Sequence, residues 1–168
     1  SDKQTNSSKF MSSGGVGLTY NDGDKYFGFS LDKLEAVYDI PGPEGEENMT
    51  SLNPTKNTFN FQSSFSFNSS YFNKFNLQGT ISEYNHSERT GSENNHNINF
   101  FSDLYEIKTS LNHNSIIESN GEGLIGFHFQ SYDQGALGQE ESNLEHTRTS
   151  SFALFALESF NFDLFDLD

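Results

Sequence analysis

The sequence predicts an all-β fold, an antiparallel up-and-down meander of about seven or eight strands. The first observation behind this prediction is the alternation of apolar and polar residues over most of the chain, as a strand with one apolar face requires. The second is composition: mean hydropathy is −0.68, yet 18 Phe and 7 Tyr bring the aromatic share to 15%. An acidic disordered chain would be poor in aromatic residues, so disorder is not expected. The sequence contains no run of about 18 apolar residues, so it predicts no membrane-spanning helix.

Each strand is expected where alternate residues are apolar. The expected strands cover residues 9–20, 25–38, 57–67, 75–86, 97–112, 122–133 and 147–160, and an eighth begins near Leu164. The alternating sets, in chain order, are Val16, Leu18 and Tyr20; Phe27, Phe29 and Leu31; Phe59, Phe61, Phe65 and Phe67; Leu77, Gly79 and Ile81; Tyr105, Ile107, Thr109 and Leu111; Ile125, Phe127 and Phe129; and Phe160, Phe162 and Leu164. The stretch Phe152–Leu157 is apolar on both faces and is compatible with a helix, but the period-two pattern that follows it favours a strand.

The connections are expected to alternate in length. Asn21–Asp24 is a strong hairpin turn, because Asn, Asp and Gly tolerate positive φ. The other short connections are Asn68–Lys74, His113–Gly121 and Asn161–Asp163, and the longer, acidic ones are Asp39–Lys56, Ser87–His96 and Gln134–His146. Short turns at one end and longer loops at the other are typical of a membrane β-barrel.

In a barrel, the two sides of residues 59–67 would meet different media. The four Phe would face lipid, and Asn60, Gln62, Ser64 and Ser66 would face a wet lumen. Tyr71, Phe72 and Phe75 around the following turn would form part of an aromatic belt. A soluble two-layer sandwich predicts the same alternation with the Phe side inward, so alternation alone does not separate the two.

Charge and motifs exclude several functions. The net charge of −15 would repel phosphate backbones, so no nucleic-acid partner is expected. No cysteine is present, which removes thiol nucleophiles and thiolate zinc sites. Residues 121–126 read Gly-x-Gly-x-x-Gly but lie within a β-alternating run, and neither Gly-x-Ser-x-Gly nor His-Glu-x-x-His occurs. We therefore expect no enzyme and no catalytic residue.

Several motifs follow one another along the chain: Gly15–Tyr20 with Tyr26–Leu31, then Tyr38–Gly42, Tyr84–Glu88, Gly123–Gln130 with Ala136–Glu140, and Phe152–Phe155. In this order they resemble the barrel of a TonB-dependent outer-membrane receptor. Tyr38–Gly42 is similar to the Tyr-Gly-Ile-Pro-Gly that opens an extracellular loop in the zinc- and iron-related branch. The resemblance spans about residues 10–165, nearly the whole chain.

The resemblance implies location in the outer membrane of a Gram-negative bacterium and uptake of a metal ion or metal chelate. Zinc or a ferric siderophore would be the transported ligand rather than a cofactor. The family's barrels have 22 strands and a plugged lumen, so residues 1–168 would form a partial β-barrel domain with no plug and no TonB box in this chain. The implied partners are membrane lipid and lipopolysaccharide, the rest of the barrel and plug, and the TonB complex through an N-terminal part.

Candidate ligand contacts lie at the ends of the longer loops. His86, His96 and His146 are imidazole ligands of the kind that zinc prefers, and carboxylates lie near them. The candidate carboxylates for ligand binding are Glu44, Glu46, Glu47, Glu88 and Glu141. The alternative interpretation, solvated side chains on an acidic rim, stays open.

Two other functions fit the same alternation. One is a soluble secreted β-sandwich that binds a carbohydrate or a protein with the same loops. The other is a pore-forming β protein, whose hairpins are also rich in Ser, Thr and Asn.

Overall fold

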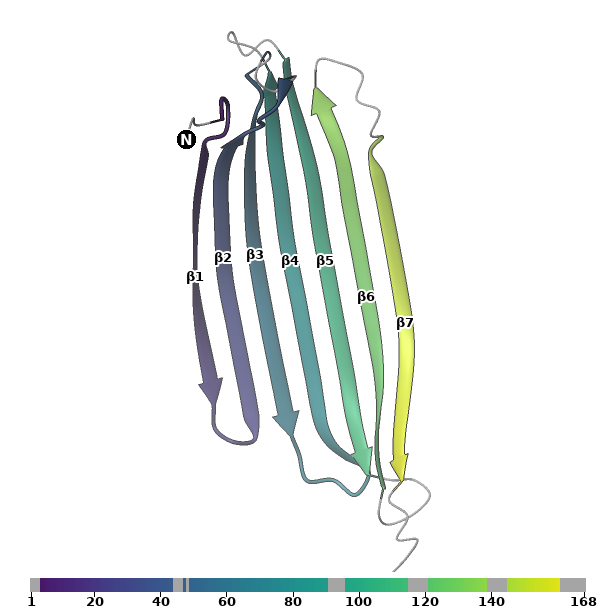
Figure 1. Ribbon diagram of the computed structural model, residues 1–168. Helices are drawn as coiled ribbons and strands as arrows, with labels where there is room; N and C mark the ends of the chain where they lie inside the picture. The colour runs from purple at the N-terminus through teal and green to yellow at the C-terminus, as the bar shows by residue number, and fades with distance from the viewer. Residues whose placement is uncertain are drawn as a thin grey trace, which may run out of the picture.

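A computed structural model of the chain describes residues 4–43, 47, 49–90, 96–114, 121–138 and 145–160. These residues form one seven-stranded antiparallel sheet in which the strands follow their order in the chain (Figure 1). The strands are β1 (Lys9–Asn21), β2 (Lys25–Asp39), β3 (Ser51–Ser66), β4 (Phe72–Thr90), β5 (His96–Asn114), β6 (Gly121–Gly138) and β7 (Thr147–Phe160). The predicted all-β meander is confirmed, and the eighth strand expected near Leu164 lies outside the described residues.

Three strands extend at least four residues beyond their predicted bounds at one end of the sheet. β3 begins at Ser51 rather than at residue 57, β4 continues to Thr90, and β6 continues to Gly138. Residues 51–56 and 87–90 are mostly polar, so their sequence gives only a weak signal for a strand. Backbone hydrogen bonds nevertheless pair β3 with β4 here, because these bonds do not depend on the side chains.

The predicted loops Asp39–Lys56, Ser87–His96 and Gln134–His146 are therefore too long. The connections at this end, here called the upper end, are residues 40–50, 91–95 and 139–146. Those at the lower end are residues 22–24, 67–71 and 115–120. The difference between the ends is smaller than expected, because 91–95 is no longer than 67–71.

The β1–β2 turn has the geometry that its sequence predicts. Gly23 has a φ of 96°, a conformation that glycine adopts without steric cost. Asp22 Oδ1 accepts the backbone N–H of Lys25 at 2.7 Å and that of Asp24 at 3.2 Å. These bonds lower the pKa of the Asp22 carboxyl, with the Lys25 N–H as the largest cause.

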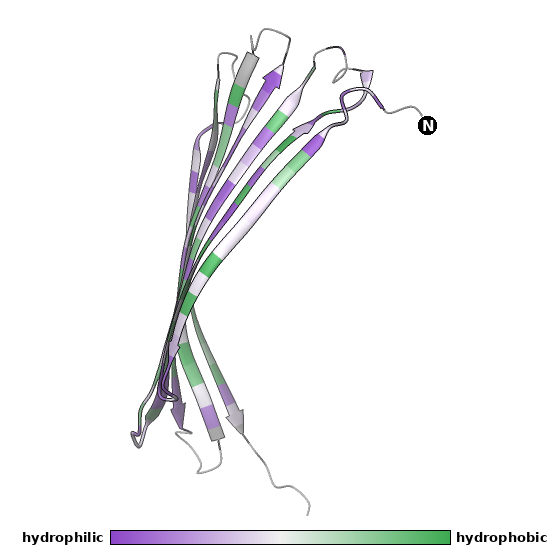
Figure 2. Cartoon of the chain, turned by 90° about the vertical axis from the view of Figure 1, so that its left-hand side faces the viewer, coloured by the Kyte–Doolittle hydropathy of each residue, from purple (hydrophilic) through white to green (hydrophobic). Residues whose placement is uncertain are grey.

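The sheet is twisted and forms a single layer (Figure 2). Among the described residues, Ala36 is the one buried hydrophobic residue, and many large apolar side chains are exposed. The two packed sheets that a sandwich needs are not formed within this part of the chain.

Glycines in β6 let side chains of β5 and β7 meet across it. At Gly123, a Cβ would lie 2.6 Å from Cε1 of His113, whose Nε2 is 3.4 Å from Oε2 of Glu158. At Gly126, the Phe155 ring occupies the place of a side chain. β7 is thus held to the sheet by side-chain contacts that extend beyond its direct neighbour.

We predict that Gly126→Ala destabilises the protein. The new Cβ would lie 2.7 Å from the backbone oxygen of Thr109 and would also clash with the Phe155 ring, and a backbone atom cannot move cheaply. The expected loss is about 1–3 kcal/mol in the free energy of unfolding, measured by urea unfolding.

The matched control is Gly14→Ala, because a Cβ at Gly14 meets nothing within 4 Å. This variant should be neutral or slightly stabilising, since glycine loses more conformational entropy on folding than alanine. Equal stability of the two variants would contradict the packing described for β6.

Candidate functional site

One face of the sheet presents a band of apolar side chains. The strand register aligns them in four successive rows, one of which joins Leu18, Phe29, Phe61, Gly79, Ile107, Phe129 and Phe152. The apolar side chains of these rows, called the apolar band below, are Val16, Leu18, Tyr20, Phe27, Phe29, Leu31, Phe59, Phe61, Phe65, Phe75, Leu77, Ile81, Tyr105, Ile107, Leu111, Ile125, Phe127, Phe129, Phe152, Leu154 and Ala156. Many are strongly exposed, Phe29 at 48% and Leu154 at 78%. An apolar surface of this extent indicates contact with a membrane or a partner.

A row of charged and polar residues borders the apolar band at its upper edge. The register places one such residue in every strand from β2 to β7, and we call this set the charged row: Lys33, Asn57, Glu83, Asp103, Asp133 and Arg148. Below it, the four apolar rows extend about 20 Å along the strands, since two residues rise about 6.8 Å. Lipid-facing bands of membrane barrels are about 25 Å tall.

From β1 to β6 the opposite face is mostly polar at the depth of the apolar band, whereas β7 presents Ala153, Phe155 and Leu157 there. Asn60 Nδ2 donates to Ser30 Oγ at 3.3 Å, and Thr80 Oγ1 donates to Asn60 Oδ1 at 3.0 Å. Nearer the lower end, Asn76 Nδ2 donates to Ser110 Oγ at 3.2 Å. The polar side chains of neighbouring strands thus satisfy one another's hydrogen-bonding groups on this face.

Above the charged row, the other face also carries apolar and aromatic residues. Pro54, His86, Phe100 and Ala136 are successive cross-strand neighbours there. The His86 and Phe100 rings are stacked, with their centroids 4.5 Å apart and their planes at 15° to each other. The centroid of the Tyr84 ring lies 5.6 Å from that of the His86 ring. Because Phe101 and Leu137 lie on the face of the apolar band, both faces are of mixed polarity above the charged row.

Asp133 is the centre of an ion cluster at the β6–β7 end of the charged row. Its Oδ2 accepts Arg148 Nε–H at 2.8 Å and a second guanidinium N–H, and its Oδ1 contacts His146 Nε2. Arg148, and next to it His146, hold the pKa of the Asp133 carboxyl below its usual value. In contrast, burial raises the pKa of Asp103, and the nearby Glu83 and Asp133 carboxylates raise it further.

The structure does not bring the candidate histidine ligands together. His86 lies within β4 on the face of Phe100, and its Nδ1 is buried without a hydrogen-bond partner. The His146 ring contacts the ring of Phe101, whose side chain points to the face opposite that of Phe100. His146 also lies next to Gly135. His96 begins β5, where its backbone pairs with Thr90. In the described ranges, no group of three or more His, Asp or Glu is placed to hold a metal ion.

The candidate carboxylates are spread along the upper end. Glu47 is exposed in the connection between β2 and β3. Glu88 is half-buried in β4, opposite Leu52 and Ile98, and thus in a strand rather than in a loop. Glu44, Glu46 and Glu141 lie outside the described residues.

Sequence reasoning missed the charged row. Its members are far apart in the chain, and each looks like an ordinary polar residue of its own strand. A signal was available, since a charged or polar residue flanks the upper end of each alternating run: Lys33 follows Leu31 and Glu83 follows Ile81, whereas Asn57 precedes Phe59.

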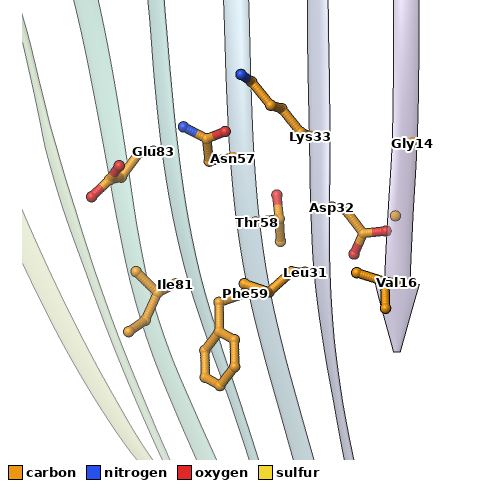
Figure 3. A pocket seen from close by; sticks show the side chains of 11 residues that line it. Gly14, Val16, Leu31, Asp32, Lys33, Asn57, Thr58, Phe59, Ile81 and Glu83 are labelled. Carbon is orange, nitrogen blue, oxygen red and sulfur yellow. The ribbon is translucent and has the colours of Figure 1, made fainter. Parts of the chain in front are cut away.

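A shallow hollow of about 570 Å³ lies where the apolar band meets the charged row in β1 to β4 (Figure 3). Its lower part is lined by Val16, Leu31, Phe59 and Ile81. Its upper part is lined by polar groups, among them Lys33, Asn57 and Glu83. The hollow is thus apolar at one end and charged at the other.

No protein-family model matches the sequence, and no curated protein matches it. Among solved structures, the chain is similar to the ferric yersiniabactin uptake receptor FyuA from Yersinia pestis, with 9% sequence identity and a TM-score of 0.46. The match covers 89% of this chain and 25% of the FyuA chain, so this chain spans about a quarter of that receptor. The described residues include no helix long and apolar enough to span a membrane.

We predict that Asp133 makes stability depend on pH in the acid range. Because the folded-state pKa is depressed, the stabilisation is present above the unfolded pKa of about 3.9 and is lost as pH falls through the lower folded value. Asp133→Asn should therefore lower the urea midpoint at neutral pH and flatten its decline in acid. A variant whose acid decline is as steep as that of the wild type would contradict the assignment.

Proposed function

We propose that this sheet is part of the wall of a transmembrane β-barrel in the outer membrane, with the apolar band in contact with lipid. The observation that supports this proposal best is the depth-matched polarity of the two faces. From β2 to β5, at the level where one face is apolar, the other is polar, and its side chains form hydrogen bonds between strands. A barrel wall has this pattern, because lipid lies outside and water inside.

The two edges of the sheet support the same proposal. β1 pairs only with β2, and β7 only with β6, within the described part of the chain. Exposed edges in lipid would leave backbone N–H and C=O groups unpaired at a cost of several kcal/mol each. Further strands of a larger barrel would pair with both edges, in agreement with residues 1–168 as a partial β-barrel domain.

We further propose that the barrel is a TonB-dependent receptor that takes up a metal ion or metal chelate. The ordered motifs from Gly15–Tyr20 to Phe152–Phe155 support this assignment. The upper end would face outward and contact the cargo. Glu47 and Glu88 are described there, and Glu44, Glu46, Glu141 and the three candidate histidines remain proposed contacts. Plug and TonB complex would be the partners, and no residue is assigned a chemical step.

A pair of tryptophan probes tests the membrane orientation, because the chain has no Trp of its own. We predict that Phe29→Trp, in the apolar band, is quenched strongly by phospholipids with brominated acyl chains and weakly by acrylamide. Gln62→Trp, at nearly the same depth on the polar face, should show the reverse, because it would face the lumen. The measurement is steady-state fluorescence of the purified protein reconstituted in vesicles.

Strong acrylamide quenching of both probes would overturn the barrel-wall proposal. Equal quenching of both probes by brominated lipid would also overturn it, because a wall exposes only one face to lipid. Unaltered far-UV circular dichroism of each variant serves as the folding control.

Transport is tested separately in whole cells. Cells that produce the complete protein should accumulate radiolabelled zinc or a labelled ferric siderophore faster than cells without it. A protonophore should abolish the difference, since the TonB system is driven by the proton gradient of the inner membrane. Accumulation that is unaffected by the protonophore would contradict the TonB-dependent receptor, while leaving the barrel wall intact.

A further inference from the structure

The polar face of the sheet has a hollow of its own, of about 380 Å³, in β1 to β4. We call it the polar hollow. None of the described residues that line it is charged, although the chain carries a net charge of −15. The side chains that it offers to a ligand are those of Tyr26, Ser30, Asn60, Gln62, Gln78 and Thr80.

Glycines in β1 and β2 shape the floor of the polar hollow. Gly17 contributes no side chain to it. At Gly28, a Cβ would lie 2.7 Å from the hydroxyl oxygen of Tyr26, so the Tyr26 side chain extends along β2 over this glycine. The hollow therefore has an aromatic ring with a hydroxyl group on one side and amide groups on the other.

A chain of hydrogen bonds fixes the upper part of the polar hollow. Thr80 donates to Asn60, and Asn60 donates to Ser30 Oγ. Ser30 Oγ in turn donates to Asp32 Oδ2 at 3.1 Å. Because a carboxylate only accepts hydrogen bonds, Asp32 sets the direction of the whole chain. Asp32 lies one row above the hollow, where it would repel an anionic ligand.

Two glutamines remain available to a ligand. Gln62 and Gln78 are direct cross-strand neighbours, and both are exposed. Within the described part of the chain, neither side chain has a hydrogen-bond partner. Each amide offers two N–H donors and a carbonyl acceptor, and neighbouring strands are about 4.8 Å apart. Such a pair matches adjacent hydroxyl groups, which both donate and accept.

The charged residues beside the polar hollow are engaged elsewhere. Glu106 and Lys108 of β5 continue two of its rows. Glu106 Oε1 lies 2.7 Å from His128 Nε2, and Lys108 Nζ lies 5.6 Å from the centroid of the Phe155 ring. Both side chains are thus directed towards β6 and β7, away from the hollow.

We propose that the polar hollow binds a neutral saccharide. Its hydroxyl groups would exchange hydrogen bonds with Gln62 and Gln78, and the less polar face of a sugar ring would lie against Tyr26. A charged ligand would lose hydration here without meeting an opposite charge. The inference goes beyond the metal cargo proposed for the upper end. It rests on the proposed barrel only in placing this site in the lumen.

A fluorescence titration with maltose, a neutral disaccharide, tests the proposal. Because the chain has no Trp, Tyr26→Trp places a single aromatic reporter in the polar hollow. Phe155→Trp places a matched reporter in the same row of the polar face, but outside the hollow. We predict that maltose changes the emission of Tyr26→Trp in a saturable way and leaves that of Phe155→Trp unchanged. The complete protein in detergent is used.

Two leucine variants in the Tyr26→Trp background test the role of the amides. Gln78→Leu should raise the half-saturating maltose concentration about two- to tenfold, as expected for one lost neutral hydrogen bond. Gln130→Leu makes the same change on the same face, outside the hollow, and should have no effect. Maltose 1-phosphate should bind more weakly than maltose, because no cation lines the hollow.

Saturation-transfer difference NMR with maltose and the unmutated protein provides a measurement without a reporter. No saturation transfer and no change of Tyr26→Trp emission would overturn the proposal, including the case in which a plug fills the hollow. An equal loss in Gln78→Leu and Gln130→Leu would overturn it too. Equally tight binding of maltose 1-phosphate would overturn the neutral class of ligand.

These outcomes are separate from those of the brominated-lipid experiment. A protein that passes that experiment but does not bind maltose would lose the saccharide site and keep the barrel wall. A protein that binds maltose but fails that experiment would keep the saccharide site, and its location in a lumen would be wrong.

Discussion

The side-chain rows of this sheet depend on a backbone hydrogen-bond ladder that keeps one register through nearly all of its strand pairs. A single irregularity, between Phe72 and Lys74, lies at the lower end of β4, away from the apolar band. Because side chains alternate along a strand, a slip of one residue would move every side chain of that strand to the other face. A slip in β3 would place Asn60 and Gln62 among the apolar side chains. The apolar band and the charged row are therefore both consequences of register.

The contrast between the two faces is confined to the depth of the apolar band. There, Phe59 and its row neighbours lie on one face and Asn60 on the other. Above the charged row both faces are mixed, since Phe101 pairs with Asn85 on the face of Phe59, while Phe100 lies on the other face. A barrel wall would have such a limited zone of contrast, because its two faces would meet different media only within the membrane.

The sequence was sufficient for the number and order of the described strands, because apolar alternation is a local signal and each run is bounded by turn residues. It was insufficient for the upper ends of β3 and β4, where most residues are polar and the backbone pairing shows that they belong to strands. It was also insufficient for the ligand candidates. His86 and His146 are predicted at the ends of longer loops at the same end of the barrel, but the register places them on opposite faces of the sheet. Contacts such as Arg148 with Asp133 depend on pairings that no single strand reveals.

The charged row differs between its two ends, and the difference follows from the spacing of opposite charges. At the β6–β7 end, Arg148 and Asp133 are direct cross-strand neighbours, so their charges neutralise each other and tie the edge strand β7 to the sheet. At the β2–β4 end, Asn57 separates Lys33 from Glu83, so the two side chains are two strands apart and too distant to pair directly. Lys33 instead contacts Glu35 Oε1 at 2.6 Å within its own strand, a pair in which both side chains are more than half exposed. The charged row thus joins two strands by an ion pair at the β6–β7 end, whereas at the β2–β4 end the ion pair of its lysine lies within a single strand.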